Sequence, residues 1–226
     1  MNSLFYKSLK LAKEKYRTFL LILAIDMLFF ASIYFINSIA KSFLLAVLRN
    51  SIRGIIFLIV YIGLVLAAYS FFKYAVLHFI RSMGKKEKFS LNRLRKFSFL
   101  NIIIFAIALL IYFALSGFIY FMVNKQDWVF VGMILGIPFA LFFYALINIT
   151  NSLFALGSSN PLKEGLNFVF KKTNEYMGVY INILVFALIY AVLSLFKAKI
   201  LLFVVLLLGY AVFSFNRVYF YEIVKK

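Results

Sequence analysis

The chain has 226 residues, of which 65% are hydrophobic and 14% are charged, and its formal net charge is +18. Ordinary soluble domains are roughly 45–50% apolar, so this composition excludes a soluble globular protein and requires lipid to cover the surplus apolar surface. With no cysteine and one histidine, His78, the sequence also excludes thiol catalysis, disulfides, cysteine-ligated metals and multi-histidine metal sites.

The first predicted element is a basic amphipathic helix that precedes the first apolar stretch. Its apolar side chains recur at spacings of four, three and four residues: Phe5, Leu9, Ala12 and Tyr16. Its cations occupy another helical face: Lys7, Lys10, Lys13 and Arg17. Such a helix is typical of segments that lie at the lipid headgroups.

Six apolar stretches follow, and each is long enough to cross a bilayer core about 30 Å thick as a helix of about 20 residues. The predicted spans are 19–40, 55–80, 99–123, 128–156, 177–196 and 200–221. Only Lys197, Ala198 and Lys199 separate the last two spans, and we expect a hairpin because one continuous helix would carry two lysines in mid-membrane. The fold class is therefore an all-α polytopic bundle, with residues 1–226 forming a single transmembrane domain.

The cations predict the orientation of this domain, because cytoplasmic connections are enriched in lysine and arginine. One side collects 18 cations: Lys7, Lys10, Lys13, Lys15, Arg17, Arg81, Lys85, Lys86, Lys88, Arg93, Arg95, Lys96, Lys163, Lys171, Lys172, Arg217, Lys225 and Lys226. The other side has six: Lys41, Arg49, Arg53, Lys125, Lys197 and Lys199. Both termini are expected in the cytoplasm of a cell-membrane protein, with anionic headgroups as partners and no nucleic acid.

The connections on the cytoplasmic side share a pattern. Asn160 and Pro161 predict an N-cap and a first helical turn before the fifth span, and Lys88 to Phe97 is a shorter basic segment before the third. The plan is an interfacial helix followed by a helical hairpin, three times over. The alternative is that these are ordinary basic connections without any repeat.

This layout resembles six-helix prokaryotic membrane families, including the membrane domain attached to some glycerophosphodiester phosphodiesterases. The most similar stretch runs from Lys163-Glu164-Gly165-Leu166 through Phe186. Those membrane domains carry no catalytic motif, so the resemblance implies no reaction and transfers no residue roles.

Two charged residues lie inside predicted spans, Asp26 in the first and Lys73 in the second. Each is seven residues from the cytoplasmic end of its span, which places both about 10 Å deep. One interpretation is an ion pair, or a proton-exchanging acid, that lines a cytoplasm-facing cavity. The other is that Lys73 extends its amine to the headgroups and Asp26 stays protonated or hydrated.

Polar amides collect at a similar depth in the later spans. They are Asn101, Asn148, Asn151, Asn182 and Asn216, and Thr150 and Ser152 lie beside them. Interhelical hydrogen bonding is one role for these side chains, and a polar vestibule open to the cytoplasm is the other.

The fourth span contains features that affect helix packing. Gly132 and Gly136 form a GxxxG pair, which permits close approach of another helix and is expected to serve packing within the chain, with dimerisation as the alternative. Pro138 removes a backbone donor and predicts a kink.

No nucleotide-binding, metalloprotease or hydrolase motif occurs, no pair of carboxylates lies within the spans, and no cofactor site is evident. We therefore expect a non-enzymatic accessory or organising membrane component. A small-solute transporter or permease subunit, with a polar cavity around Asp26 and Lys73, is the alternative, followed by an intramembrane lipid enzyme. The sequence leaves open a protein partner or homo-oligomer.

Overall fold

The computed structural model describes residues 2–47, 51–82, 89–195 and 199–225. The described elements are the helices α1 (Asn2–Glu14), α2 (Tyr16–Val47), α3 (Ser51–Ser82), α4 (Leu91–Met122), α5 (Trp128–Leu156), α6 (Pro161–Lys171), α7 (Thr173–Leu195) and α8 (Lys199–Val224), with a short 3-10 helix η1 (Lys125–Asp127). The described part of the chain contains no strand, so the all-α prediction is confirmed for it.

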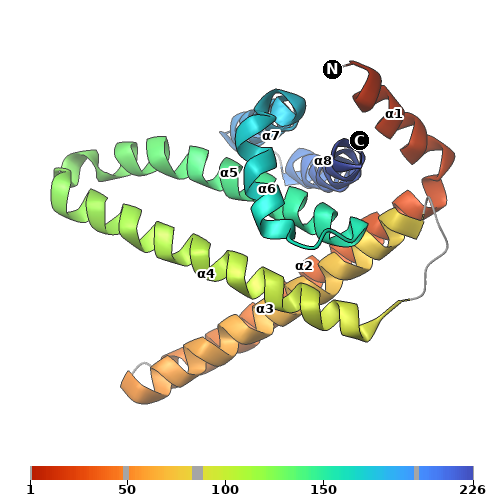
Figure 1. Cartoon of the computed structure of the whole chain (residues 1–226). Coiled ribbons are helices and arrows are strands. Elements are labelled where there is room, and N and C mark those ends of the chain that lie inside the picture. Colours follow the sequence, from red (N-terminus) through yellow and green to blue (C-terminus); the bar gives the residue numbers. More distant parts are fainter. Residues whose placement is uncertain (1, 48–50, 83–88, 196–198, 226) are drawn as a thin grey trace.

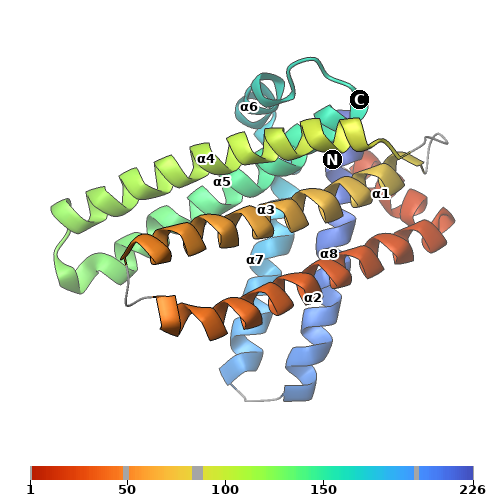
Figure 2. The ribbon, with the colours of Figure 1, turned by 90° about the horizontal axis from the view of Figure 1, so that it is seen from below.

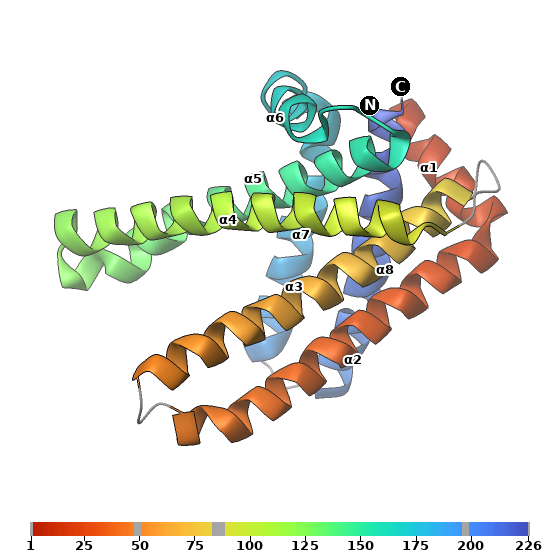
Figure 3. The same cartoon turned by 60° about the horizontal axis from the view of Figure 1, so that its bottom comes forward.

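The long helices form three antiparallel hairpins, α2 with α3, α4 with α5, and α7 with α8. The hairpins converge at one end and splay apart at the other, as Figures 1 and 2 show from two sides. Both chain termini and α6 lie at the converging end (Figure 3). Contacts between different hairpins join α3 to α4 and α5, and α8 to α2 and α5.

The buried core lies at the converging end. Its two clusters are built on Phe143, Ile149 and Phe220 in one case and on Ile22, Val76 and Val218 in the other. Toward the splayed end, large apolar side chains stay exposed, for example Tyr34 and Phe121 at 77% and 80%. Lipid is the solvent in which such apolar surfaces are stable, so the structure is that of a membrane protein. Its hairpins pack against one another at one end.

Among the described residues, five helices are by length and composition able to cross a membrane: Tyr16–Lys41, Ile52–Ser82, Leu91–Met122, Lys125–Leu156 and Thr173–Leu193. Each of them overlaps one of the first five predicted spans and is longer than predicted. The sixth predicted span, 200–221, falls within α8, whose first residues have side chains outside the described part. The predicted turn at 197–199 also lies largely outside the described residues, although α7 and α8 do pack as a hairpin.

Two of the three expected amphipathic segments form separate helices. α1 leads into α2 through a single turn residue, Lys15, whose amide donates to the Leu11 carbonyl at 2.9 Å. α6 begins at Pro161 with Asn160 as its N-cap residue, as predicted, although the Asn160 side chain forms no capping hydrogen bond with the described residues.

The third expected segment is different. α4 begins at Leu91 with Ser90 as its N-cap, and the Ser90 hydroxyl accepts from the Arg93 amide at 3.4 Å. Residues 91–97 are thus the first turns of the spanning helix itself, because nothing between them and the apolar stretch interrupts the helical backbone. Residues 83–88 lie outside the described part of the chain.

Glycines decide how α5 and α6 meet. α5 ends at Gly157, whose φ of 93° is left-handed, and the Gly157 and Ser158 amides donate to the carbonyls of Phe154 and Leu153. Gly165 then lies so close to α5 that an added Cβ would be 2.3 Å from the Thr150 Oγ1. Gly165 is therefore needed for this close approach.

The predicted use of the GxxxG pair is wrong. A Cβ on either Gly132 or Gly136 would meet no described atom within 4 Å, because the α4–α5 hairpin extends away from the other helices there. Pro138 lies inside α5, as predicted from its position.

Candidate functional site

A buried ion pair joins the first and last long helices. Asp26 of α2 is 4% exposed, and its Oδ1 pairs with the Arg217 guanidinium of α8. Its Oδ2 accepts a hydrogen bond from the Ser214 Oγ at 2.6 Å. Ser214 and Arg217 are three residues apart and share one face of α8, so a single helix face supplies partners for both carboxylate oxygens.

A second polar contact joins the middle helices. Lys73 of α3 is 5% exposed, and its Nζ donates to the Asn148 Oδ1 of α5 at 2.7 Å. Asn148 in turn donates through Nδ2 to the Tyr144 carbonyl at 2.7 Å, which orients the amide toward the lysine. Lys73 also lies within electrostatic range of Arg217 and Asp26, so the two contacts form one cluster where α2, α3, α5 and α8 meet.

Two amides of the cluster have unused hydrogen-bonding capacity. The side chains of Asn151 and Asn216 are fully buried, and among the described residues the interaction of each amide with a tyrosine hydroxyl falls short of good hydrogen-bond geometry. Asn151 faces the Tyr69 hydroxyl and Asn216 faces the Tyr144 hydroxyl. A buried polar group left without a partner costs about 1–3 kcal/mol. A further hydrogen-bonding partner would therefore be stabilised at these two amides.

The structure brings together five of the six predicted site residues: Asp26, Lys73, Asn148, Asn151 and Asn216. Asn182 lies apart from them, in a groove between α1, α7 and α8. Among the described residues, Asn101 donates to the Phe97 carbonyl of its own helix, at 3.0 Å.

The pairing expected between Asp26 and Lys73 is not the one that forms. Arg217 and Ser214 take the carboxylate, and Asn148 takes the ammonium, because α8 packs against α2 and α5 packs against α3. The low exposure of both charged side chains also contradicts an open cavity around them, and a lysine that extends to the headgroups.

Sequence reasoning missed Arg217 and Ser214 as members of the site. Arg217 had been counted among the cytoplasmic cations, although it precedes the predicted end of its span by four residues. That position, about 6 Å deep at 1.5 Å per residue, was the available signal.

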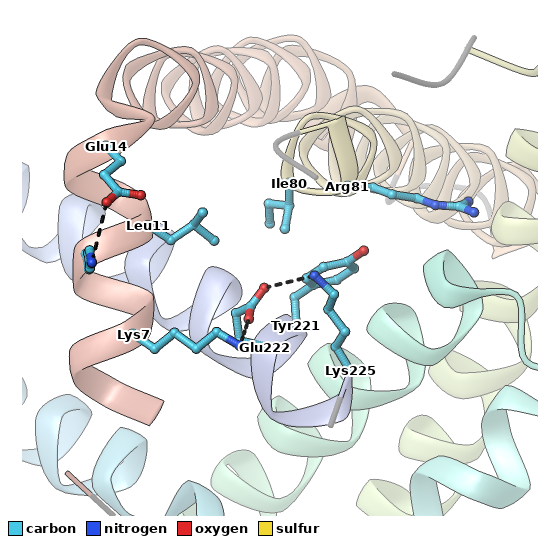
Figure 4. A pocket seen from close by; sticks show the side chains of 9 residues that line it. Lys7, Leu11, Glu14, Ile80, Arg81, Tyr221, Glu222 and Lys225 are labelled. Atoms are coloured by element: carbon cyan, nitrogen blue, oxygen red, sulfur yellow. Dashed lines mark ion pairs between the residues drawn. The ribbon is translucent and has the colours of Figure 1, made fainter. Parts of the chain in front are cut away.

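A separate pocket of about 340 Å³ opens at the converging end between α1, α3 and α8 (Figure 4). Glu222 of α8, 5% exposed, pairs there with Lys7 of α1 at 3.6 Å and with Lys225 at 3.8 Å. Lys10 and Glu14 form a further pair along α1 at 3.9 Å. Figure 4 shows these three pairs, and the one between Lys7 and Glu222 joins the N-terminal helix α1 to the C-terminal helix α8.

Comparisons of the chain with models of known protein families, with curated proteins and with solved structures find no match.

Proposed function

We propose that this protein is a non-enzymatic accessory or organising component of the cell membrane. The observation that carries the proposal is the closed cluster of Asp26, Arg217, Ser214, Lys73 and Asn148. Each charged group has a partner on another helix, Asp26 with Arg217 and Lys73 with the Asn148 amide, an arrangement suited to holding three hairpins together. The exposed apolar outer parts of those hairpins then offer a wide surface to lipids and to other membrane proteins.

The proposed arrangement in the membrane has six spans, with α8 as the sixth, and both termini in the cytoplasm. The split of 18 cations against six supports this orientation. The converging end, with the polar cluster and α6, then lies toward the cytoplasm, and the splayed tips lie toward the opposite face. The same proposal includes three units, each made of an interfacial segment followed by a helical hairpin. In the second unit the interfacial segment is continuous with the first helix of its hairpin.

A small-solute transporter is the second candidate, and the spare hydrogen-bonding capacity of the Asn151 and Asn216 amides among the described residues favours it. A solute with polar groups would find hydrogen-bonding partners there if the hairpins separated and admitted it. The ion pair of Asp26 and Arg217 would then break during transport, rather than serve as a permanent structural contact.

The experiment that separates the two functions compares flux with stability. In proteoliposomes of the purified chain, the organising role predicts that proton and potassium permeability equals that of protein-free vesicles. It also predicts that Asp26→Asn lowers the melting temperature, because the substitution breaks a structural contact. A transporter predicts flux that Asp26→Asn abolishes, with a folded state as stable as before or more so, since binding-site charges are commonly retained at a cost in stability. Asp26-dependent flux would therefore refute the organising role.

A further inference from the structure

A large groove lies against α1, on the side of that helix away from the charged pocket. It measures about 830 Å³ and is bounded by α1, the start of α2, and the facing sides of α7 and α8. Its lining side chains are Leu9, Ala12, Lys13, Phe19, Asn182, Val185, Phe186, Ile189, Leu208, Ala211, Val212 and Phe215. At its floor α7 and α8 approach closely, because a Cβ on Gly209 would be only 3.2 Å from the Phe186 ring.

The polar side chains that line this groove lie at one end of it, and the apolar side chains extend to the other end. α7 starts at the converging end and α8 finishes there, so Asn182 and Phe215 lie toward that end while Ile189 and Leu208 lie deeper. Among the described lining residues, the two polar side chains are Lys13 of α1 and Asn182 in the near part of α7, and the deeper ones are all apolar. An occupant must therefore have one polar, anion-bearing end and an apolar body.

Among the described residues, Lys13 differs from Lys7 and Lys10 of α1 in forming no ion pair. Lys7 is paired with Glu222 and Lys10 with Glu14, but Lys13 forms no ion pair with any acid in the described part of the chain. The Asn182 amide likewise has no hydrogen bond to any other described residue. The groove thus presents one unused cation and one unused amide at the end nearest the headgroups.

We propose that this groove binds one anionic phospholipid from the leaflet on the side where the hairpins converge. Lys13 and Asn182 contact the phosphate, and an acyl chain lies along the apolar walls beside Val185, Ile189 and Val212. This inference does not depend on the organising role proposed above, because it requires only that the hairpins lie in a membrane.

The length of the groove favours a lipid over a transmembrane helix of another protein. Its walls run from Asn182 to Ile189 on α7 and from Leu208 to Phe215 on α8. Seven residues at 1.5 Å each give about 10 Å, which is shorter than one leaflet, about half of a hydrocarbon core about 30 Å thick. A spanning helix would need a groove along the whole of α7 and α8, and it would also collide with α1, which covers the polar end.

The test places a tryptophan in the groove and measures its quenching by brominated lipids in nanodiscs. Trp128→Phe removes the one native tryptophan, Val185→Trp reports on the groove, and Leu110→Trp, on the exposed face of α4, reports on bulk lipid. A lysine near an anionic surface contributes about 1 kcal/mol, or about a fivefold preference. Half-maximal quenching at position 185 should therefore need about fivefold less brominated phosphatidylglycerol than brominated phosphatidylcholine, whereas position 110 should show no preference.

Substitutions of exposed cations complete the test without threatening the fold. Lys13→Gln should abolish the preference at position 185, Lys13→Arg should keep it, and Lys163→Gln on α6 should leave it unchanged. Equal quenching by both lipids at position 185, or a preference that survives Lys13→Gln, would overturn the proposal. So would a tryptophan at 185 that neither lipid quenches while position 110 is quenched, because the groove would then be filled by protein, such as a second copy of the chain.

Discussion

Neutralising Asp26 should destabilise the fold chiefly by leaving Arg217 without its counter-ion. Breaking one partner out of a buried ion pair typically costs 3–5 kcal/mol. Two features of this site lower that figure. The Arg217 side chain is 17% exposed and can recruit other partners, and helices that separate within a micelle also find new partners, which weakens measured polar contacts. We therefore expect about 2–3 kcal/mol for Asp26→Asn, and a similar cost for Arg217→Met.

The double variant carries the decisive information. With both charges removed, no group is left stranded, so Asp26→Asn with Arg217→Met should cost at least about 1.5 kcal/mol less than the sum of the two single changes. The free energies come from titration with sodium dodecyl sulfate in mixed micelles, with helix loss followed by far-ultraviolet circular dichroism. Glu14→Gln is the matched control, because the Lys10–Glu14 pair is well exposed and should contribute less than about 0.5 kcal/mol.

The reasoning fails if the costs of the two single variants add to within about 0.5 kcal/mol, the tolerance expected for independent sites. It also fails if Asp26→Asn costs no more than Glu14→Gln. In either case the ion pair would not be what holds α2 against α8, and the apolar contacts of Ile22 and Val218 would have to account for the contact between these helices.

Three further predictions concern the rest of the fold. Gly165→Ala should destabilise the protein by about 1–3 kcal/mol, because the added Cβ overlaps the Thr150 Oγ1. A second substitution in the same chain, Thr150→Ala, should recover part of the lost melting temperature. An unchanged melting temperature for Gly165→Ala would show that α6 does not pack closely on α5. A cysteine at Ser159 should react with a membrane-impermeant maleimide only from the cytoplasmic side and one at Gln126 only from outside, and the reverse pattern would invert the topology. A peptide of residues 1–18 should become helical on anionic vesicles and lose that helicity in high salt, whereas a peptide that stays unfolded on them would mean that α1 depends on its contacts with α8.

The positions of the apolar helices could be predicted from the sequence, because a bilayer imposes length and composition on each helix independently of the others. A stretch such as 128–156 must satisfy its own backbone hydrogen bonds wherever it packs, so its bounds follow from the local sequence, and α5 has those same bounds. The same locality explains why α1 and α6 were found from their amphipathic pattern and from Pro161. It also explains why the separate helix predicted at Lys88 to Phe97 was wrong. The basic first turns of a spanning helix and a separate basic helix have similar compositions, so the local sequence does not distinguish them.

The partners of the polar residues were not readable, because they depend on the rotation and order of the helices. Depth along each span placed Asp26 and Lys73 at one level, but Arg217 lies near that level too, and sequence spacing does not say which of the two cations faces the acid. The GxxxG pair failed for a related reason: its spacing permits close packing, yet a hairpin that extends away from the bundle presents nothing to pack against.

The sequence by itself determined that this is a helical membrane protein, where most of its spans lie, and which polar residues sit inside them, because each of those properties is local to one segment. Tertiary structure alone decided that the hairpins meet at only one end, that Asp26 belongs to Arg217 and Ser214, and that Asn182 lies in a groove with Lys13. Those outcomes rest on contacts between helices up to 191 residues apart in sequence. They depend on how the side-chain surfaces of several helices fit together, which no single segment encodes.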